Sequence, residues 1–312
     1  MLYRSLYCSM LSLMYQIFDI IDVCITFVDV QCVKPFNLSV IMQLRVLVDN
    51  FADSQSGVQC EHGLSFFFRC GGRNFLLDVG ATSLFAENAC RLGVDISAVD
   101  YLILSHAHAD HTGGLSAFFA LNSKAKVYLS SHVCGKRFYS TRRGGVRDIS
   151  IDASLLELYK DRFVFVDDNL AVTDCVSLLC NVALVYPLPM ANDTLLADGV
   201  KDDFSHELSV CVTDGDGVKV LSPCSHCGLM NILNAVPGGD VTHFVGGLHL
   251  LDSDEMYSFE SEAEVRRLAR RVASMGIKLY TGHCTGSVAR RIFSEEMGDC
   301  FAEFRAGDIF SF

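Results

Sequence analysis

The chain has 312 residues, of which 50% are hydrophobic, and this is enough to form one large domain or two modest ones. Its formal net charge of −12 disfavours non-specific binding to nucleic acid or to an anionic membrane. The 14 cysteines show no regular disulfide framework, which favours a reducing cytoplasm in which thiols stay free.

Residues 1–41 differ from the remainder of the chain. They are apolar, but Asp19, Asp22 and Asp29 interrupt any run long enough to cross a bilayer. A signal peptide would need a compact apolar stretch and a small-residue cleavage site, and no convincing site follows. We predict a non-core extension over residues 1–41, or sequence ahead of the natural start, with a membrane anchor as the alternative. The folded domain is expected over residues 42–312.

The first half of this domain alternates strand and helix signals. Leu44–Val48, Leu64–Arg69 and Asn74–Asp78 are short apolar runs that favour strands, and a Gly-Gly turn between the last two is typical of a hairpin. A helix is expected over residues 82–92, because apolar residues recur on one face and a glycine follows. Tyr101–Ser105 then predicts another buried strand.

Side chains suited to metal binding follow that strand directly. Within six residues the chain has His106, His108, Asp110 and His111. Imidazole nitrogen and carboxylate oxygen are ligands that divalent zinc, iron or manganese accept. On an extended backbone His106 and His108 point the same way and could share one ion, whereas Asp110 and His111 follow a turn and could face a second. The glycines at 113–114 are expected to let the backbone turn tightly.

The pattern His-x-His-x-Asp-His resembles the metal-binding signature of the metallo-β-lactamase superfamily. Smaller motifs resemble one branch of it: Val46–Asn50, Glu61–Ser65 and Leu77–Gly80. That branch includes proteins similar to the synthase that joins a dihydropterin to a ribofuranosyl-aminobenzene 5′-phosphate, and many members described as metal-dependent hydrolases. The resemblance implies an α/β (α+β) fold, a four-layer αββα sandwich, with residues 42–312 as the catalytic domain.

The second half offers further ligands where predicted strands end. Leu208–Thr213 and Val218–Leu221 flank an Asp-Gly-Asp-Gly turn, which is a hairpin signal. The second of these strands leads to His226, the candidate third ligand of the first ion. Ile277–Tyr280 leads to His283, which is expected to complete the site of the second ion.

Two alternatives remain for the first ion. Cys224 is close to His226 and could reach the metals as a thiolate. The resembling branch usually has Thr-Gly-Cys-Ser-His here, so Pro223 is a departure that could alter the turn. His206 precedes a strand at a point where other superfamily members place a metal histidine, and it competes with His226.

A basic stretch in the middle of this acidic chain is the candidate substrate-binding segment. The guanidinium groups of Arg137, Arg142 and Arg143 are expected to grip a phosphate or carboxylate, since arginine matches such anions bidentately. A solvated loop is the alternative interpretation. Glu61 and His62 are expected to border the active-site mouth, with a surface turn as the alternative.

Other positions are expected to support the site. Asp78 is expected to order the metal loop through hydrogen bonds and not to bind metal itself. His249 is either a substrate-facing acid–base or a hydrogen-bonded core histidine. Residues 148–207 are expected to hold a variable insertion. Ser261 and Glu264 have the spacing of a capping box that begins a helix.

The predicted function is that of a metal-dependent hydrolase with two divalent ions, zinc first, with iron or manganese as alternatives. A metal-activated water would attack a phosphoester or lactone-type substrate, with Asp110 orienting the water and His249 assisting proton transfer. The alternatives are a transferase similar to the pterin synthase and a metal-binding protein without catalysis. The expected partner is an anionic small molecule, with no nucleic acid and no membrane, in the cytoplasm.

Overall fold

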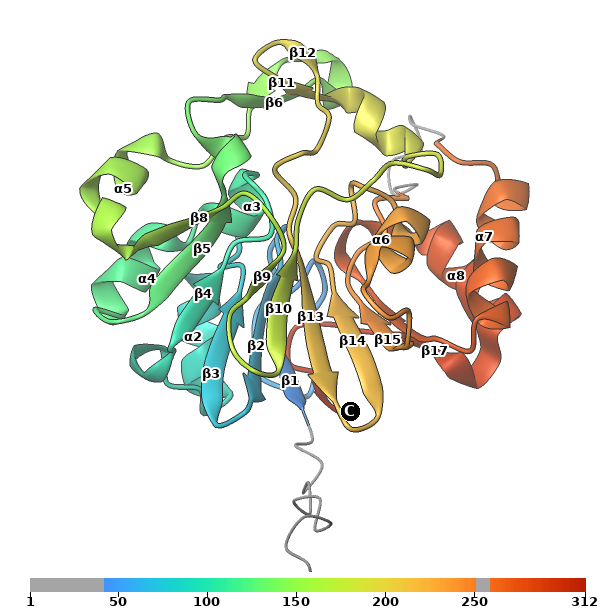
Figure 1. Cartoon of the computed structure of the whole chain (residues 1–312), viewed down its shortest axis with the longest axis horizontal. Coiled ribbons are helices and arrows are strands. Elements are labelled where there is room, and N and C mark those ends of the chain that lie inside the picture. The colour runs from blue at the N-terminus through green and yellow to red at the C-terminus, as the bar shows by residue number, and fades with distance from the viewer. Residues whose placement is uncertain (1–41, 251–258) are drawn as a thin grey trace, which may run out of the picture. The chain divides into compact units, whose positions relative to one another are not determined.

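Two seven-stranded β-sheets form the centre of the fold (Figure 1). The structure is a computed structural model that describes residues 42–250 and 259–312, apart from the side chain of Arg143. Residues 1–41, for which we predicted a non-core extension, lie outside the described residues. Within the described ranges, no helix combines the length and the apolar character needed to cross a bilayer.

The first sheet has the strand order β18-β1-β2-β3-β4-β5-β8. Its strands are β1 (Gln43–Val48), β2 (Ser65–Cys70), β3 (Arg73–Leu77), β4 (Tyr101–Ile103), β5 (Lys126–Ser130), β8 (Phe163–Val166) and β18 (Ile309–Ser311). β2 and β3 form the predicted antiparallel hairpin. From β3 to β8 the neighbours are parallel, so the carboxyl ends of β3, β4 and β5 meet at one edge.

The second sheet has the order β17-β16-β15-β14-β13-β10-β9. Its strands are β9 (Leu170–Ala171), β10 (Val176–Leu179), β13 (Ser209–Asp214), β14 (Gly217–Leu221), β15 (Val241–Val245), β16 (Lys278–Thr281) and β17 (Phe301–Glu303). β13 and β14 form the hairpin predicted from the Asp-Gly-Asp-Gly turn. β14, β15 and β16 are parallel, so their carboxyl ends also share one edge.

A four-stranded sheet with the order β12-β11-β6-β7 lies beyond the two large sheets (Figure 1). Its strands are β6 (Phe138–Ser140), β7 (Arg147–Asp148), β11 (Leu195–Ala197) and β12 (Val200–Lys201). The segment predicted to be a variable insertion, residues 148–207, supplies β11 and β12 to this small sheet. The same segment supplies β8 and β10 to the two large sheets, so part of it belongs to the central sandwich and is not an insertion.

Helices cover the outer faces of both large sheets, and this confirms the predicted αββα sandwich. The helices are α2 (Leu84–Arg91), α3 (Ala109–Thr112), α4 (Leu115–Leu121), α5 (Ala153–Leu158), α6 (Leu229–Ala235), α7 (Glu262–Ser274) and α8 (Ser287–Met297). α2 and α4 contribute Phe85 and Phe118 to the core on the first sheet. α6, α7 and α8 contribute Ile232, Ala269 and Phe293 to the core on the second.

A third apolar core fills the space between the sheets, and it explains the continuous apolar character of the early strands. Phe66 and Phe68 of β2 enter this inter-sheet core, whereas Phe67 between them enters the core under α2 and α4. Because successive side chains point to opposite faces, a strand buried on both faces is apolar at every position.

The structure corrects the reason given for the glycines at 113–114. Gly113 and Gly114 have φ of −65° and −75°, which other residues adopt readily. A Cβ at Gly113 would instead lie 2.1 Å from the carbonyl oxygen of Ala81, and one at Gly114 would lie 2.3 Å from that of Val79. Glycine is therefore required because the helix start packs directly against the backbone that follows β3.

The predicted capping box at the start of α7 is confirmed. The hydroxyl of Ser261 accepts a hydrogen bond from the Glu264 backbone N–H at 3.3 Å, and the Glu264 carboxylate accepts one from the Ser261 N–H at 3.0 Å. Both interactions satisfy backbone donors that the first turn of a helix leaves unpaired.

We therefore expect Ser261→Ala to lower the free energy of unfolding by about 1 kcal/mol, because it removes the side-chain cap. Urea denaturation of the metal-loaded protein measures this change. Ser274→Ala, at the other end of the same helix, is the matched control and should change stability by less than about 0.5 kcal/mol. Equal losses in the two variants would contradict a specific capping role.

Candidate metal centre

Three histidines from two loops form the first donor group, His106, His108 and His226. His106 and His108 lie on the segment between β4 and α3, and His226 lies on the loop between β14 and α6. One ring nitrogen from each falls within 4.8 Å of the others. All three rings are buried, and each has an Nε2 without a hydrogen-bond partner among the described residues.

Hydrogen bonds at Nδ1 of His106 and of His226 indicate that Nε2 of each ring carries no proton and has a free lone pair. The Ser105 hydroxyl donates to the Asp78 carboxylate at 2.7 Å, so its oxygen accepts from Nδ1–H of His106 at 2.7 Å. Nδ1–H of His226 similarly donates to the side-chain oxygen of Asn192 at 3.0 Å. In both rings Nε2 is then the nitrogen that can bind a metal ion.

Burial keeps this donor group neutral. It lowers the pKa of His108 to about 3, and it lowers the pKa of His106 and of His226 well below the usual histidine value. Neutral imidazole is the form that binds a metal ion. Three buried lone pairs that converge without a donor would be costly unless a cation joins them, so the group fits a divalent ion.

Asp110, His111 and His283 form the second donor group, with donor atoms also within 4.8 Å of one another. Nε2 of His111 and Nε2 of His283 are 3.2 Å apart. A carboxylate oxygen of Asp110 lies 3.5 Å from the first of these nitrogens and 3.6 Å from the second. His283 is fixed from behind, since its Nδ1 lies 3.0 Å from the side-chain oxygen of Asn50.

The second donor group attracts positive charge. Although burial lowers the pKa of His283, its hydrogen bond to Asp110 raises that pKa to about 9. Although burial raises the pKa of Asp110, the neighbouring His111 and His283 hold it well below the ordinary value. A carboxylate with two facing imidazole nitrogens therefore also fits a divalent cation.

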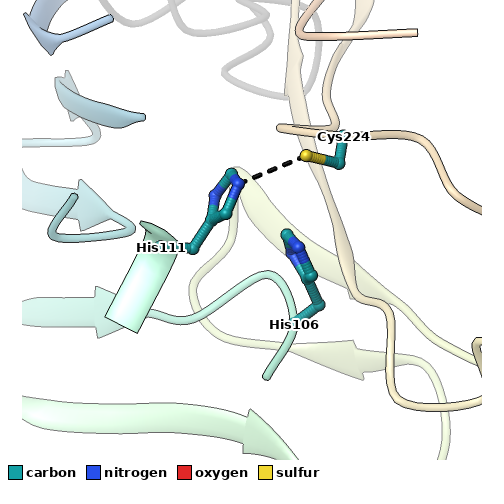
Figure 2. A group of neighbouring side chains, drawn as sticks. All are labelled: His106, His111 and Cys224. Carbon is teal, nitrogen blue, oxygen red and sulfur yellow. Dashed lines mark hydrogen bonds between the residues drawn. The ribbon is translucent and has the colours of Figure 1, made fainter. Parts of the chain in front are cut away.

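Cys224 lies between the two donor groups. Its sulfur is 3.2 Å from Nε2 of His111, and it also falls within 4.8 Å of the donor nitrogens of both His106 and His111 (Figure 2). A second thiol, that of Cys284, is 3.5 Å from the Cys224 sulfur. The sequence analysis missed Cys284, although it directly follows His283.

Buried acids hold the loops that carry these donors. The Asp78 carboxylate accepts hydrogen bonds at 2.7 Å from the Ser105 N–H, the Ser105 hydroxyl and Nδ1 of His111, and this confirms its predicted ordering role. Glu207, which the sequence analysis missed, accepts from the backbone N–H groups of His226 and Cys227, each at 2.7 Å. The Pro223 loop is therefore held by a buried carboxylate.

Backbone strain also collects around the centre. Asp78, His249 and His283 have φ of 60°, 49° and 46°, and Ser225 beside His226 has φ of 55°. Residues other than glycine rarely adopt these values, and each costs on the order of 1 kcal/mol. Such strain persists at functional sites because the surrounding structure holds it there.

A pocket opens on both donor groups. Besides donor residues, its lining includes His62, Ser140, Arg142, Arg147 and His249, and three of these come from the small sheet or the turn within it. The small sheet thus forms part of the wall that faces the candidate metal centre.

Two residues that were expected at the substrate site, Arg142 and His62, have contacts that place them at the pocket. The Arg142 guanidinium lies 3.2 Å from Nε2 of His249 and 3.4 Å from the Thr194 hydroxyl. The ring of His62 stacks on that of His283 with centroids 5.6 Å apart. Both residues line the pocket, so His62 lies where a residue at the active-site mouth was expected, and Arg142 lies where a substrate anion could contact it.

Two other predicted substrate-binding residues do not line the pocket. Arg137 is exposed and forms an ion pair with Asp148. The Glu61 carboxylate accepts hydrogen bonds from the backbone N–H groups of Ala81 and Thr82, each at 3.1 Å, so it anchors the loop after β3. The side chain of Arg143 lies outside the described part of the chain.

The geometry also separates His226 from its competitor His206. The Ala107 N–H donates to Nδ1 of His206 at 3.3 Å, and Nε2 of His206 lies 3.0 Å from the buried carboxylate of Asp202. Both ring nitrogens of His206 are thus engaged, whereas His226 presents Nε2 to the first donor group. These contacts favour His226.

Comparisons with known proteins agree with this arrangement. The family profile described as "Metallo-beta-lactamase superfamily" matches residues 58–174. A solved metal-dependent hydrolase of the beta-lactamase superfamily superimposes with a TM-score of 0.73 at 27% identity, over 86% of this chain and 98% of that one. Over residues 58–174 the chain therefore resembles the metallo-β-lactamase superfamily in sequence, and its fold is similar to that of a solved protein of this superfamily.

The similarity within the superfamily extends over most of the chain. A 7,8-dihydropterin-6-methyl-4-(beta-D-ribofuranosyl)-aminobenzene-5'-phosphate synthase from Methanocaldococcus jannaschii is 24% identical over 298 residues, which are 87% of this chain and 97% of that protein. A metallo-beta-lactamase fold protein from Bacillus subtilis has a TM-score of 0.56 at 13% identity, over 87% of this chain and 100% of that one, and shows the fold alone.

The role of Asp78 gives a test of the centre. The Asp78 carboxylate accepts hydrogen bonds from Ser105 and His111, and Asp78→Asn would replace one of its acceptor oxygens with an N–H donor. The segment with His111 would then lose its fixed orientation. We expect the affinity for a divalent ion to fall roughly 10–100-fold, as measured by competition with a chromophoric chelator.

Asp95→Asn is the matched control for this variant, because Asp95 is an exposed acid that caps a short turn. It should keep the metal affinity of the unaltered protein. Unchanged affinity in the Asp78 variant would show that its hydrogen bonds do not support the centre.

Proposed function

We propose that the chain is a metal-dependent hydrolase with two divalent ions, one at each donor group. The observation that carries the proposal is the set of three buried, unpartnered Nε2 atoms on His106, His108 and His226. The second group, with Asp110, offers a mixed oxygen and nitrogen site within reach of the same pocket. His106, His226 and His283 follow β4, β14 and β16, and Asp110 and His111 lie in α3, which begins six residues after β4.

Zinc is the ion we propose, with iron or manganese as alternatives. Zinc accepts imidazole, carboxylate and thiolate, and this centre contains all three kinds of donor. Cys224, which lies near nitrogens of both groups, is proposed as a thiolate ligand shared between them. Thiolate suits zinc or iron better than manganese.

Two divalent ions in this centre would polarise a phosphoryl or carbonyl oxygen and activate a water for attack. The chain's own groups would orient the reactants. We propose that the Asp110 carboxylate, which faces the pocket, accepts a hydrogen bond from the attacking water. His249 is proposed to assist proton transfer, because its ring lines the pocket, and burial and the adjacent Arg142 lower its pKa and so keep the ring neutral.

The proposed substrate is an anionic small molecule, a phosphoester first and a lactone second. Arg142 and Arg147 face the pocket from the small sheet and its turn, and guanidinium groups match phosphate or carboxylate bidentately. This local positive charge stands out in a chain of net charge −12. The same net charge supports the proposal that nucleic acid is not a partner.

A transferase similar to the pterin synthase is the second candidate. Its support is that the similarity spans 97% of the length of that synthase, so nearly the whole synthase has a counterpart here. A cytoplasmic location is also proposed, because the described cysteines are free thiols.

Metal analysis and a substrate panel test the proposed function. The zinc-loaded protein is assayed with phosphodiesters, phosphomonoesters, lactones and a thioester, and for condensation of a dihydropterin with a ribofuranosyl-aminobenzene 5′-phosphate. Turnover of a phosphoester or lactone that a chelator abolishes supports the hydrolase. Condensation alone supports the transferase, and metal binding without any turnover contradicts both.

The same substitution at two histidines tests the first donor group. We expect His226→Gln to reduce bound metal from two ions to one and to lower kcat/KM at least 100-fold, because Nε2 of His226 is the proposed ligand. His206→Gln should keep two ions, since glutamine can still accept from Ala107 and donate to Asp202. Metal content by plasma mass spectrometry measures both, and the opposite pattern would make His206 the ligand.

Two arginines provide a matched test of anion recognition. Arg142→Ala should raise KM for an anionic substrate roughly 10–100-fold, because it removes a charge-assisted hydrogen bond at the pocket. Arg137→Ala should leave KM unchanged, because Arg137 pairs with Asp148 outside the pocket. Steady-state kinetics of the two variants measure the difference, and equal KM values would exclude Arg142 from substrate binding.

A further inference from the structure

Two cysteines from different sheets meet at the edge opposite the metal centre. Cys70 ends β2, and Cys175 immediately precedes β10. Their sulfur atoms are 2.7 Å apart although 105 residues separate them in the chain. In the first sheet, Cys70 pairs with the start of β3, whereas Asp78 of the metal centre follows the end of β3. In the second sheet, Val176 beside Cys175 pairs toward the end of β13, whereas His206 precedes its start.

The backbone holds both thiols in this contact. The carbonyl of Cys175 accepts a hydrogen bond from the Thr213 N–H on β13 at 2.9 Å, and the next residue, Val176, donates to the Thr173 hydroxyl at 3.1 Å. On the other side, Gly71 has φ of 56°, and a Cβ there would lie 2.9 Å from the Cys175 sulfur. The glycine turn thus leaves room for the second thiol.

The two thiols differ in access. Cys70 is buried, with 2% of its surface exposed, whereas Cys175 is half-buried. Burial and the hydrogen bond to Cys175 raise the pKa of the Cys70 thiol to about 12. An oxidant from solvent therefore reaches Cys175 first, and Cys70 is the buried thiol that can then react with the oxidised Cys175.

We propose that Cys70 and Cys175 are a redox-active thiol pair that closes to a reversible disulfide between the two sheets when the protein meets a peroxide. The contact needs only a small further approach, because a disulfide bond length is about 2.05 Å. Neither thiol belongs to the donor groups, so this site is separate from the proposed hydrolase centre.

The oxidation proceeds in two balanced steps. The Cys175 thiolate attacks one oxygen of hydrogen peroxide and breaks the O–O bond. This gives a sulfenic acid at Cys175 and, after proton uptake, one water. The Cys70 sulfur then attacks the Cys175 sulfur, the S–O bond breaks, and a second water leaves with the Cys70 proton. Two thiols lose two electrons in all, and a dithiol reductant reverses the change.

The disulfide would link two sheets that otherwise contact each other through the inter-sheet apolar core. It closes a loop of about 100 residues, and a link of this length restricts the unfolded chain strongly. We expect Tm to rise by roughly 5–10 °C on oxidation. Activity should stay unchanged, because the link lies at the edge away from the pocket.

Peptide mapping of the folded, zinc-loaded protein tests the proposal. The protein is treated with hydrogen peroxide near stoichiometric amounts, its remaining thiols are blocked, and it is digested without reductant. A linked pair of peptides containing Cys70 and Cys175, together with a raised Tm that dithiothreitol reverses, supports the proposal. The same map reports whether Cys224 and Cys284 at the metal centre stay reduced.

Two variants make the result specific. Cys175→Ser should lose both the linked peptides and the rise in Tm, whereas Cys134→Ser, which changes an exposed cysteine on another element, should keep both. Oxidation that modifies Cys134 or Cys90 while Cys70 and Cys175 remain separate thiols would overturn the proposal. A linked pair that forms only after unfolding in denaturant would overturn it as well.

Discussion

The buried carboxylate of Asp78 is the interaction on which the candidate metal centre depends. It accepts hydrogen bonds from the backbone and hydroxyl of Ser105 and from the ring of His111. Through the Ser105 hydroxyl it also fixes which nitrogen of His106 carries the proton. One acid therefore orients a histidine in each donor group, and it does so from a left-handed backbone position at the end of β3.

The packing of two sheets supplies the remaining donors. His106 and His111 follow β4 of the first sheet, with His111 in α3, whereas His226 and His283 follow strands of the second. These loops meet only because the inter-sheet core, which includes Phe66 and Val210, holds the two sheet edges together. The burial that stabilises this core also removes water from the rings of His106 and His226, so these two histidines stay neutral and available to a cation.

The sequence predicted some parts of the site well for a local physical reason. Four donors in six residues behind a buried strand limit the possible arrangements, and Asp78 could be assigned because it ends the neighbouring strand. Glu207 and Asn192 could not be assigned, since they lie in a segment of short, irregular elements. Their roles depend on a loop that approaches from the other sheet, and no local pattern encodes that approach.

The sequence by itself determined the dense donor motif, the main strands and the two hairpins, because these depend on neighbouring residues and on periodicity. Only the tertiary structure brings Nε2 of His226 near the donor nitrogens of His106 and His108, while both ring nitrogens of His206 form hydrogen bonds with Ala107 and Asp202. It also decided that Arg142 faces the pocket while Arg137 does not. Contacts between residues far apart in sequence follow from tertiary packing, and local sequence patterns do not predict them.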